Sequence, residues 1–223
     1  MNFATLKSLT IPEGVVTQIA DGQGRVLWHR RKYKTEISYL KSTGTQYIDT
    51  LMFLNNNSAL DLQGVFDCTA GATRFGARNG TSADTNGVFA INAVTSNQFR
   101  IDFGASAEKN TQWLVSKKQA DRFLVDGLSN TATVNFTDGT SESYTYPSGN
   151  FSLNHSVLIF AFNGNGSVAF ATDMKATACK LYDNGILVRD FIPVLDWNDV
   201  PCMYDKVSGE LFYNQGTGEF IYE

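Results

Sequence analysis

Apolar and polar residues alternate with a period of two along most of the chain. In "ALDLQGVF" (59–66), Leu60 and Leu62 fall on one side, and Asp61 and Gln63 fall on the other. This alternation is typical of β-strands that have one face in the core and one face in solvent. The same pattern in two further strands places Phe99, Ile101, Phe103, Val134 and Phe136 inward, and Arg100 and Asp102 outward.

One segment is apolar throughout. Because "VLIFAF" (157–162) has no polar position, it is predicted to be a central strand that is covered on both faces. No stretch has the spacing of an amphipathic helix, and "SKKQADRF" (116–123) is expected to form at most one helical turn. We therefore expect the chain to consist almost entirely of β-structure.

Glycine-containing pairs separate the predicted strands. Asp126-Gly127, Asp138-Gly139 and Asn184-Gly185 each lie between strand-like runs. Asn-Gly and Asp-Gly favour the left-handed dihedral angles of tight hairpin turns. Many short strands joined by such turns predict an all-β sandwich or barrel.

The first part of the chain, residues 1–34, differs from the rest. "LTIPEGVVTQIADGQGRVLWHR" (9–30) has the pattern of a small β unit. Such a unit cannot bury enough apolar surface to be stable alone, so it is expected to dock on the main domain, on a second copy or on a larger assembly. The basic run "HRRKYK" (29–34) is interpreted as a solvated connector rather than a phosphate site. Residues 35–223 contain no linker and are predicted to form one domain.

Composition restricts the classes of function. The 223 residues carry a formal net charge of −4, which argues against attraction to a nucleic-acid backbone. No apolar run has membrane-spanning length, and the start of the chain lacks the continuous apolar segment of a signal peptide. Cys68, Cys179 and Cys202 are far apart and odd in number, so they are expected to be small buried residues rather than disulfide partners or zinc ligands.

Four segments resemble one known domain family. They are "YLKSTGTQYIDT" (39–50), "FGARNG" (75–80), "KLYDNGILVRDFIPV" (180–194) and "MYDKVSGELFYNQGTGEF" (203–220). Through them, residues 36–223 are similar to the concanavalin A-like, laminin-G-like jelly-roll domain of tail and other virion proteins of phages of gut bacteria. "IPEGVVTQIADGQGRVLW" (11–28) also resembles a short segment that recurs in phage structural proteins.

The resemblance implies a two-sheet jelly roll with a virion or surface-binding role, and it does not fix a ligand. It places residues 39–50 in the first strand region of the sandwich, with a bend at Gly44 and with Tyr47 or Ile48 turned toward the core. Residues 203–220 are expected to form a hairpin-like return. The two ends of the domain are therefore expected to pair or pack together.

Enzymatic interpretations find little support in the residues. A retaining glycoside hydrolase needs two carboxylates about 5 Å apart at one sugar ring. The pattern E-x-D-x-x-E is absent, and no Glu has an acidic partner at the required spacing in a clear strand. His29 and His155 have no accompanying G-x-S-x-G motif, and no phosphate-binding loop or zinc-ligand cluster is found. Calcium stays open as a ligand of loop oxygens, with Asp84, Asn86, Asn163 and Asp173 as donors.

Binding is the better-supported class, because sugars are held by aromatic faces and by amide or charged groups on loops over a rigid scaffold. Each candidate also has a structural explanation, as a core residue, a turn or the cap of a strand. The candidates for a carbohydrate-binding surface are Trp197, Asn198, Arg78, Asn79, Asn163, Asn165 and Trp113.

The sequence thus predicts a non-enzymatic phage virion protein that displays a lectin-like jelly-roll domain for attachment to host-surface glycan. The N-terminal segment is expected to bind other virion proteins. We expect a homo-oligomer, a trimer by analogy, that is made in the host cytoplasm and released by lysis. The alternative is a capsid or tail decoration protein without a ligand, and the third interpretation is an enzyme that degrades polysaccharide.

Overall fold

The structure of the chain is a computed structural model that forms two compact units, Met1–Lys32 and Tyr33–Glu223. In the first unit, β1 (Gln18–Ala20) pairs antiparallel with β2 (Val26–His29), so the predicted small β unit contains a hairpin. The structure describes residues 18–20, 23, 26–29, 31–67, 73–80, 87–95, 98–104, 113–115, 119–146, 149–169 and 172–223.

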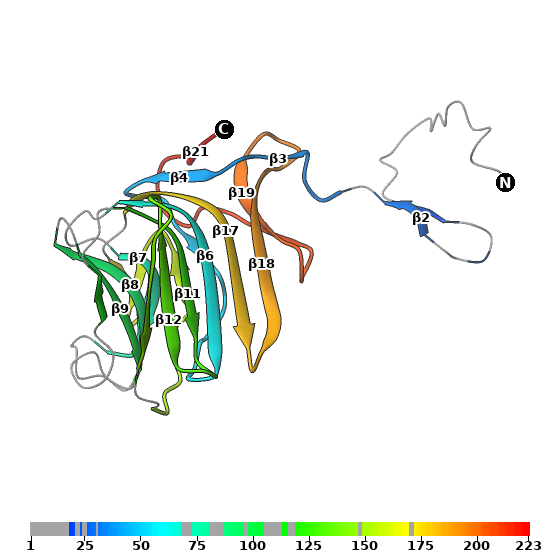
Figure 1. Ribbon diagram of the computed structural model, residues 1–223. Helices are drawn as coiled ribbons and strands as arrows, with labels where there is room; N and C mark the ends of the chain where they lie inside the picture. The colour runs from blue at the N-terminus through cyan, green and yellow to red at the C-terminus, as the bar shows by residue number, and fades with distance from the viewer. Residues whose placement is uncertain are drawn as a thin grey trace. The chain divides into compact units, whose positions relative to one another are not determined.

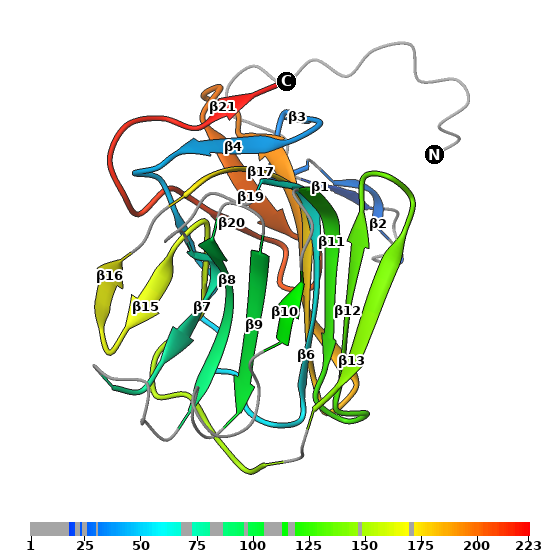
Figure 2. The ribbon, with the colours of Figure 1, turned by 60° about the vertical axis from the view of Figure 1, so that its left-hand side comes forward.

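The second unit contains two β-sheets that face one another (Figures 1 and 2). Within the described part of the chain, the larger sheet has the order β13–β12–β11–β6–β17–β18–β19–β20. In addition, β3 pairs with β18, and β4 pairs with β17 and β21. Its strands are β3 (Thr35–Glu36), β4 (Leu40–Thr43), β6 (Ser58–Asp67), β11 (Gln119–Asp126), β12 (Thr131–Phe136), β13 (Ser141–Thr145), β17 (Asp173–Asp183), β18 (Ile186–Leu195), β19 (Pro201–Asp205), β20 (Glu210–Phe212) and β21 (Ile221–Tyr222).

The smaller sheet has the order β10–β9–β8–β7–β14–β5, and the short hairpin β15–β16 joins it through β7. The β15–β7 pair is parallel, whereas every other pair among the described strands is antiparallel. The strands are β5 (Ile48–Asp49), β7 (Thr73–Arg78), β8 (Val88–Thr95), β9 (Gln98–Gly104), β10 (Trp113–Val115), β14 (Leu158–Ile159), β15 (Phe162–Gly164) and β16 (Ser167–Ala169).

The core lies between the inner faces of the two sheets. Phe99 of the smaller sheet contacts Phe123 of the larger sheet edge to face, at a centroid distance of 5.2 Å. Phe66 packs against the same ring at 5.1 Å, an arrangement that aromatic pairs favour. All five residues predicted to point inward are buried. The predicted fold class, an all-β two-sheet sandwich of the jelly-roll type, is confirmed.

The apolar segment 157–162 is buried throughout, but it is two short strands rather than one. The break falls at Phe160, which has φ of +74°, a left-handed conformation that bulky residues rarely adopt. The peptide groups of Phe160 remain paired there, because its N–H donates to the carbonyl of Arg74 and its carbonyl accepts from the N–H of Thr172. The prediction of a covered central strand is therefore right about burial and wrong about continuity.

The predicted helical turn at "SKKQADRF" is wrong where the structure describes it. Residues 119–126 form strand β11, in the middle of the larger sheet. Phe123 and Val125 point into the core while Arg122 and Leu124 lie on the other face, so the short apolar pattern belongs to a strand. In the residues that the structure describes, no helix has the length and apolar character needed to cross a membrane.

The two ends of the second unit pair with each other, as predicted. Gly44, with φ of +105°, follows β4 of the larger sheet, and the chain then enters β5 of the smaller sheet with Ile48 fully buried. Strand β21 pairs antiparallel with β4, so that Tyr222 lies opposite Leu40. The first strand region is thus held in place by the last residues of the chain.

The two cysteines that the structure describes are buried and have low reactivity. Cys179 and Cys202 are free and buried, as predicted, and Cys68 lies outside the described residues. Burial raises the pKa of Cys202 to about 12, so its thiolate form is scarce at neutral pH. Neither described thiol has the exposure of a reactive cysteine.

Candidate functional site

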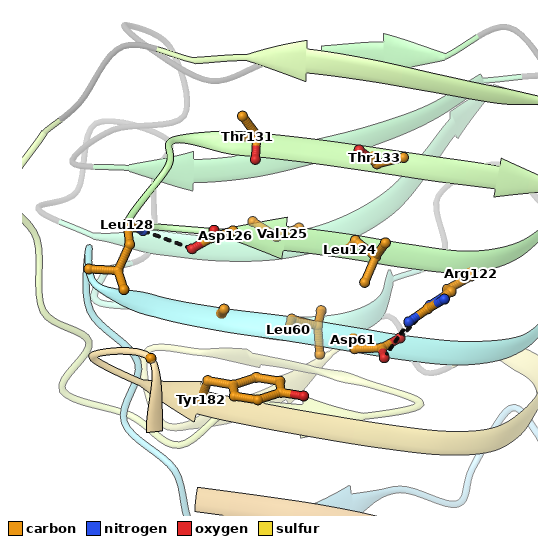
Figure 3. A pocket seen from close by; sticks show the side chains of 12 residues that line it. Leu60, Asp61, Arg122, Leu124, Val125, Asp126, Leu128, Thr131, Thr133 and Tyr182 are labelled. Carbon is orange, nitrogen blue, oxygen red and sulfur yellow. Dashed lines mark hydrogen bonds and ion pairs between the residues drawn. The ribbon is translucent and has the colours of Figure 1, made fainter. Parts of the chain in front are cut away.

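A groove with a volume of about 360 Å³ lies on the solvent-facing side of the larger sheet (Figure 3). It runs over β6, between β11 and β17. The register places Asp126 of β11 and Tyr182 of β17 on either side of Ala59. Because alanine is short and its neighbours are long, the sheet surface is hollow at this point. We call this hollow the β6 groove.

An ion pair fixes one end of the β6 groove. Arg122 donates from Nε to Asp61 Oδ1 and from Nη2 to Asp61 Oδ2, both at 2.7 Å. Gln63 also donates to both carboxylate oxygens at 3.2 Å, so the carboxylate is fully engaged. The hydrogen bond to Asp61 is the main reason that the pKa of Arg122 is raised. Such two-point pairs hold the guanidinium in a defined plane.

The guanidinium of Arg122 still has donors to offer. The pair with Asp61 uses two N–H groups, and a guanidinium carries five. The side chain of Arg122 is 39% exposed, whereas that of Asp61 is 9% exposed. A ligand oxygen can therefore reach the guanidinium, while the carboxylate below it acts as its support.

Apolar side chains form much of the rest of the β6 groove. Figure 3 shows Tyr182, Leu124 and Leu128 around it, on three neighbouring parts of the sheet. Leu128, which is 55% exposed, lies in the β11–β12 turn close to Gly185 of the β17–β18 turn. Asn184 and Gly185 have φ of 48° and 77°, as the Asn-Gly pair predicts for a tight hairpin. The two hairpin turns therefore meet at the other end of the groove.

Hydrogen bonds hold the rim of the β6 groove in place. Asp126 accepts from the N–H of Leu128 at 2.9 Å and from Ser129 Oγ at 2.7 Å, which fixes the β11–β12 turn. Thr131 Oγ1 lies 2.7 Å from Ser129 Oγ. Both carboxylates of the groove, those of Asp61 and Asp126, thus accept hydrogen bonds from other groups of the chain. The groove presents fixed N–H donors, hydroxyls and apolar surface, which suits binding.

Four of the residues predicted from the sequence lie together at one end of β7. Gly164 of β15 is opposite Arg78, and the N–H of Asn165 donates to the carbonyl of Arg78 at 3.1 Å. Arg78 also lies over the ring of Phe162, 5.4 Å from its centroid. The parallel pairing of β15 with β7 brings these segments side by side, away from the residues that line the β6 groove.

The two remaining asparagines of this group, Asn79 and Asn163, form side-chain hydrogen bonds to backbone groups of nearby loops. Asn79 donates to the carbonyl of Ser152 at 2.7 Å and accepts from the N–H of Asn154 at 2.6 Å. Asn163 donates to the carbonyl of Ser156 at 3.1 Å and accepts from the N–H of Gly166 at 2.9 Å. Both side-chain amides are therefore used to hold loops in place. This agrees with the structural explanation given for these candidates from the sequence.

Trp197 and Asn198 lie elsewhere, in the turn between β18 and β19 of the larger sheet. Trp197 is 46% exposed, and the N–H of Asn198 donates to Asp196 at 2.8 Å. Burial opposes ionisation of Asp196, but hydrogen bonds from this turn and from Tyr213 outweigh it and lower the pKa. Trp113 begins β10, opposite Ile101, and its side chain lies outside what the structure describes. The predicted residues therefore do not converge on one site.

Two of the four calcium candidates, Asn163 and Asp173, lie within the described residues. Asp84 and Asn86 lie outside the described residues. Asp173 is 3.4 Å from the ammonium group of Lys41, and both polar ends of the Asn163 side chain are hydrogen-bonded. Among the residues that the structure describes, no group of three or more His, Cys, Asp or Glu could hold a metal ion.

The residues of the β6 groove were missed because they are far apart in the sequence. Asp61, Arg122 and Tyr182 come from three different strands and meet only through strand pairing. The period-two pattern already places Asp61 on the outer face, and Tyr182 stands beside the predicted Asn184-Gly185 hairpin. These are the signals in the sequence, but they do not specify which outer positions become neighbours.

Comparison with known proteins gives matches to solved structures alone. No family model and no curated protein matches the sequence. Among solved structures, a point mutant of NanB sialidase from Streptococcus pneumoniae is similar with a TM-score of 0.43 and 11% identity. The structure "NanB plus Optactamide" is similar with a TM-score of 0.42 and 13% identity. Each alignment covers 84% of this chain and 39% of the other, so the chain spans about two fifths of their length.

Proposed function

We propose that residues 33–223 are a non-enzymatic, lectin-like binding domain of a phage virion protein, and that the β6 groove holds a host-surface glycan. The observation that carries this proposal is the combination of Tyr182, Leu124 and the oriented guanidinium of Arg122 in one groove. The placement on a virion is supported by the four family-like segments between residues 39 and 220.

The chemistry of the β6 groove matches that of a sugar. A pyranose ring has an apolar face of C–H groups, which packs on an aromatic ring or an aliphatic side chain, and a rim of hydroxyl oxygens. Tyr182 and Leu124 offer the apolar surface, and Arg122 offers N–H donors to the oxygens. Because the groove is open along the sheet face, it admits a segment within a polymer as well as a chain end.

A non-enzymatic role is supported by the state of the two carboxylates. Asp61 is engaged by Arg122 and Gln63, and Asp126 holds the β11–β12 turn. A glycosidase needs one carboxyl group that delivers a proton and a second that attacks or activates water. Neither carboxylate of the groove is placed to do so without giving up its structural partner.

The test is binding of the full-length chain to cell-wall polysaccharide purified from the host bacterium. We expect Tyr182→Ala to weaken binding at least about tenfold, because it removes the ring that carries the sugar face. The matched control is Tyr222→Ala, an exposed tyrosine of β21 outside the groove, which should bind like wild type. Loss of binding in Trp197→Ala with Tyr182→Ala unaffected would instead place the site at the β18–β19 turn.

Two other results would replace the proposal. Protein that binds no host fraction but copurifies with virion components is a decoration protein without a ligand. Release of reducing ends from the polysaccharide would establish an enzyme. Both measurements use the same preparation, so one experiment separates the three interpretations.

A further inference from the structure

A second hollow, with a volume of about 370 Å³, adjoins the β6 groove. Leu128 lines both, so the two hollows are neighbours that share its side chain. Four asparagines dominate the second hollow, which we call the asparagine pocket: Asn56, Asn57, Asn130 and Asn150. None of the residues that line it carries a charge.

Three loops build the asparagine pocket. Asn56 precedes β6, and Gly127 opens the β11–β12 turn so close to the carbonyl of Asn56 that a larger residue would collide with it. The N–H of Asn56 donates to the carbonyl of Phe151 at 3.2 Å, which brings in the third loop next to Asn150. Asn130, with φ of 53°, ends the β11–β12 turn in a conformation that asparagine tolerates. The pocket is therefore a fixed feature of this end of the sandwich.

Part of the amide array is oriented by its own hydrogen bonds. Asn56 Nδ2 donates to Asn57 Oδ1 at 2.8 Å, and Asn57 Nδ2 donates to Asn184 Oδ1 at 2.9 Å. Within the described part of the chain, the side chains of Asn130 and Asn150 make no hydrogen bond. The pocket thus offers both an oriented chain of amides and two amides whose donors and acceptors are available to a ligand.

We propose that the asparagine pocket is a second subsite for the glycan of the β6 groove and that it selects an N-acetylated amino sugar. This inference rests on the proposed function. An acetamido group has one N–H donor, one carbonyl acceptor and a methyl group. The amides of Asn130 and Asn150 complement the first two, and Leu128 supplies apolar surface for the methyl group.

The size of the two hollows points to a chain of sugars. Each hollow lies near the lower limit of small-molecule sites, which span about 300–1,000 Å³. Since Leu128 lines both, a ligand that fills both must pass over this side chain from the sheet face toward the loops. The ligand is therefore an oligosaccharide segment in which an N-acetylhexosamine follows the unit that rests on Tyr182.

The experiment uses full-length protein on an array of natural glycans that contains acetamido sugars and matched sugars without them. We expect the bound glycans to contain N-acetylhexosamine and the corresponding de-N-acetylated glycan to bind at least about tenfold more weakly. Asn150→Ala should produce a similar loss with the acetylated glycan. Asn154→Ala, an exposed asparagine outside the pocket, should stay within about twofold of wild type.

The outcomes separate this inference from the proposed function. If glycans bind, and binding is lost in Tyr182→Ala, but Asn150→Ala and de-N-acetylation have no effect, the subsite is refuted and the groove stands. If no glycan binds, both are refuted. Asn150 is exposed and has no hydrogen-bonded partner among the described residues, so its replacement is expected to leave the melting temperature unchanged.

Discussion

Asp102 is a buried carboxylate on the outer face of the smaller sheet. The sequence predicts that it points outward, and it does lie opposite Ala90 on that face, but it is only 2% exposed. Its Oδ2 accepts from Arg100 Nε at 2.9 Å and from Asn92 Nδ2 at 2.8 Å. Among the described residues, Oδ1 has no hydrogen-bond partner. Burial raises the pKa of Asp102 to about 6, against the opposing effects of Arg100, Asn92 and Arg78.

This raised pKa gives the fold a defined pH dependence. Between pH 4 and pH 6 the folded protein holds the proton of Asp102 and the unfolded chain does not, so this group makes stability fall as pH rises. The slope is at most about 1.4 kcal/mol per pH unit. We expect the free energy of unfolding of wild type, minus that of Asp102→Asn, to decrease by about 2–3 kcal/mol from pH 4 to pH 7. Urea titrations at several pH values measure it, and a constant difference would contradict it.

The last segment of the chain acts as a structural element although its strands are short. Asn214 accepts from the N–H of Tyr47 at 3.1 Å and donates to the carbonyl of Gly218 at 2.8 Å. Phe220 is buried and packs against Phe160, 5.0 Å between ring centroids, at the break in the apolar segment. This segment therefore closes the core over the strand entry at β4 and β5.

Removal of this element should abolish the fold. Deletion of residues 206–223 exposes the core around Phe160 and leaves β4 without its β21 partner, so we expect no cooperative thermal transition by circular dichroism. The point variant Phe220→Ala should keep the fold and lose about 3–5 kcal/mol of stability. Tyr222→Ala, which alters an exposed side chain of the same segment, is the control. A soluble truncation that melts cooperatively would show that the segment is not part of the core.

Strands and turns could be predicted from the sequence because their signals are local. The alternation around Leu60, the turn at Asn184-Gly185 and the pairing of the chain ends all follow from patterns within short windows or from the family resemblance. The break at Phe160 could not be predicted, since it depends on backbone partners that are distant in the chain. For the same reason the predicted binding residues were scattered. Arg122 was not recognised as a binding residue because it lies in a segment that was predicted to be a helical turn.

The whole molecule combines a large sandwich with a small hairpin unit. An isolated two-stranded hairpin is marginally stable in water, so β1 and β2 require partners to persist. A second and third copy of the same hairpin, or another protein, would supply them. For the proposed function, this matters because a shallow, open groove binds one ligand weakly, and several grooves on one particle bind together through avidity.

The valency of the full-length chain is therefore the property to measure. We expect a trimer by light scattering, and we expect Trp28→Glu, in the strand opposite Ile19, to give a monomer whose sandwich melts as in wild type. Its affinity for free oligosaccharide should be unchanged, while its apparent affinity for a dense polysaccharide surface should fall by about 10² or more. Trp197→Glu, in the second unit, should keep the oligomer. A monomeric wild type, or equal apparent affinity at sparse and dense surfaces, would contradict the prediction that the hairpin forms an oligomer and supplies avidity.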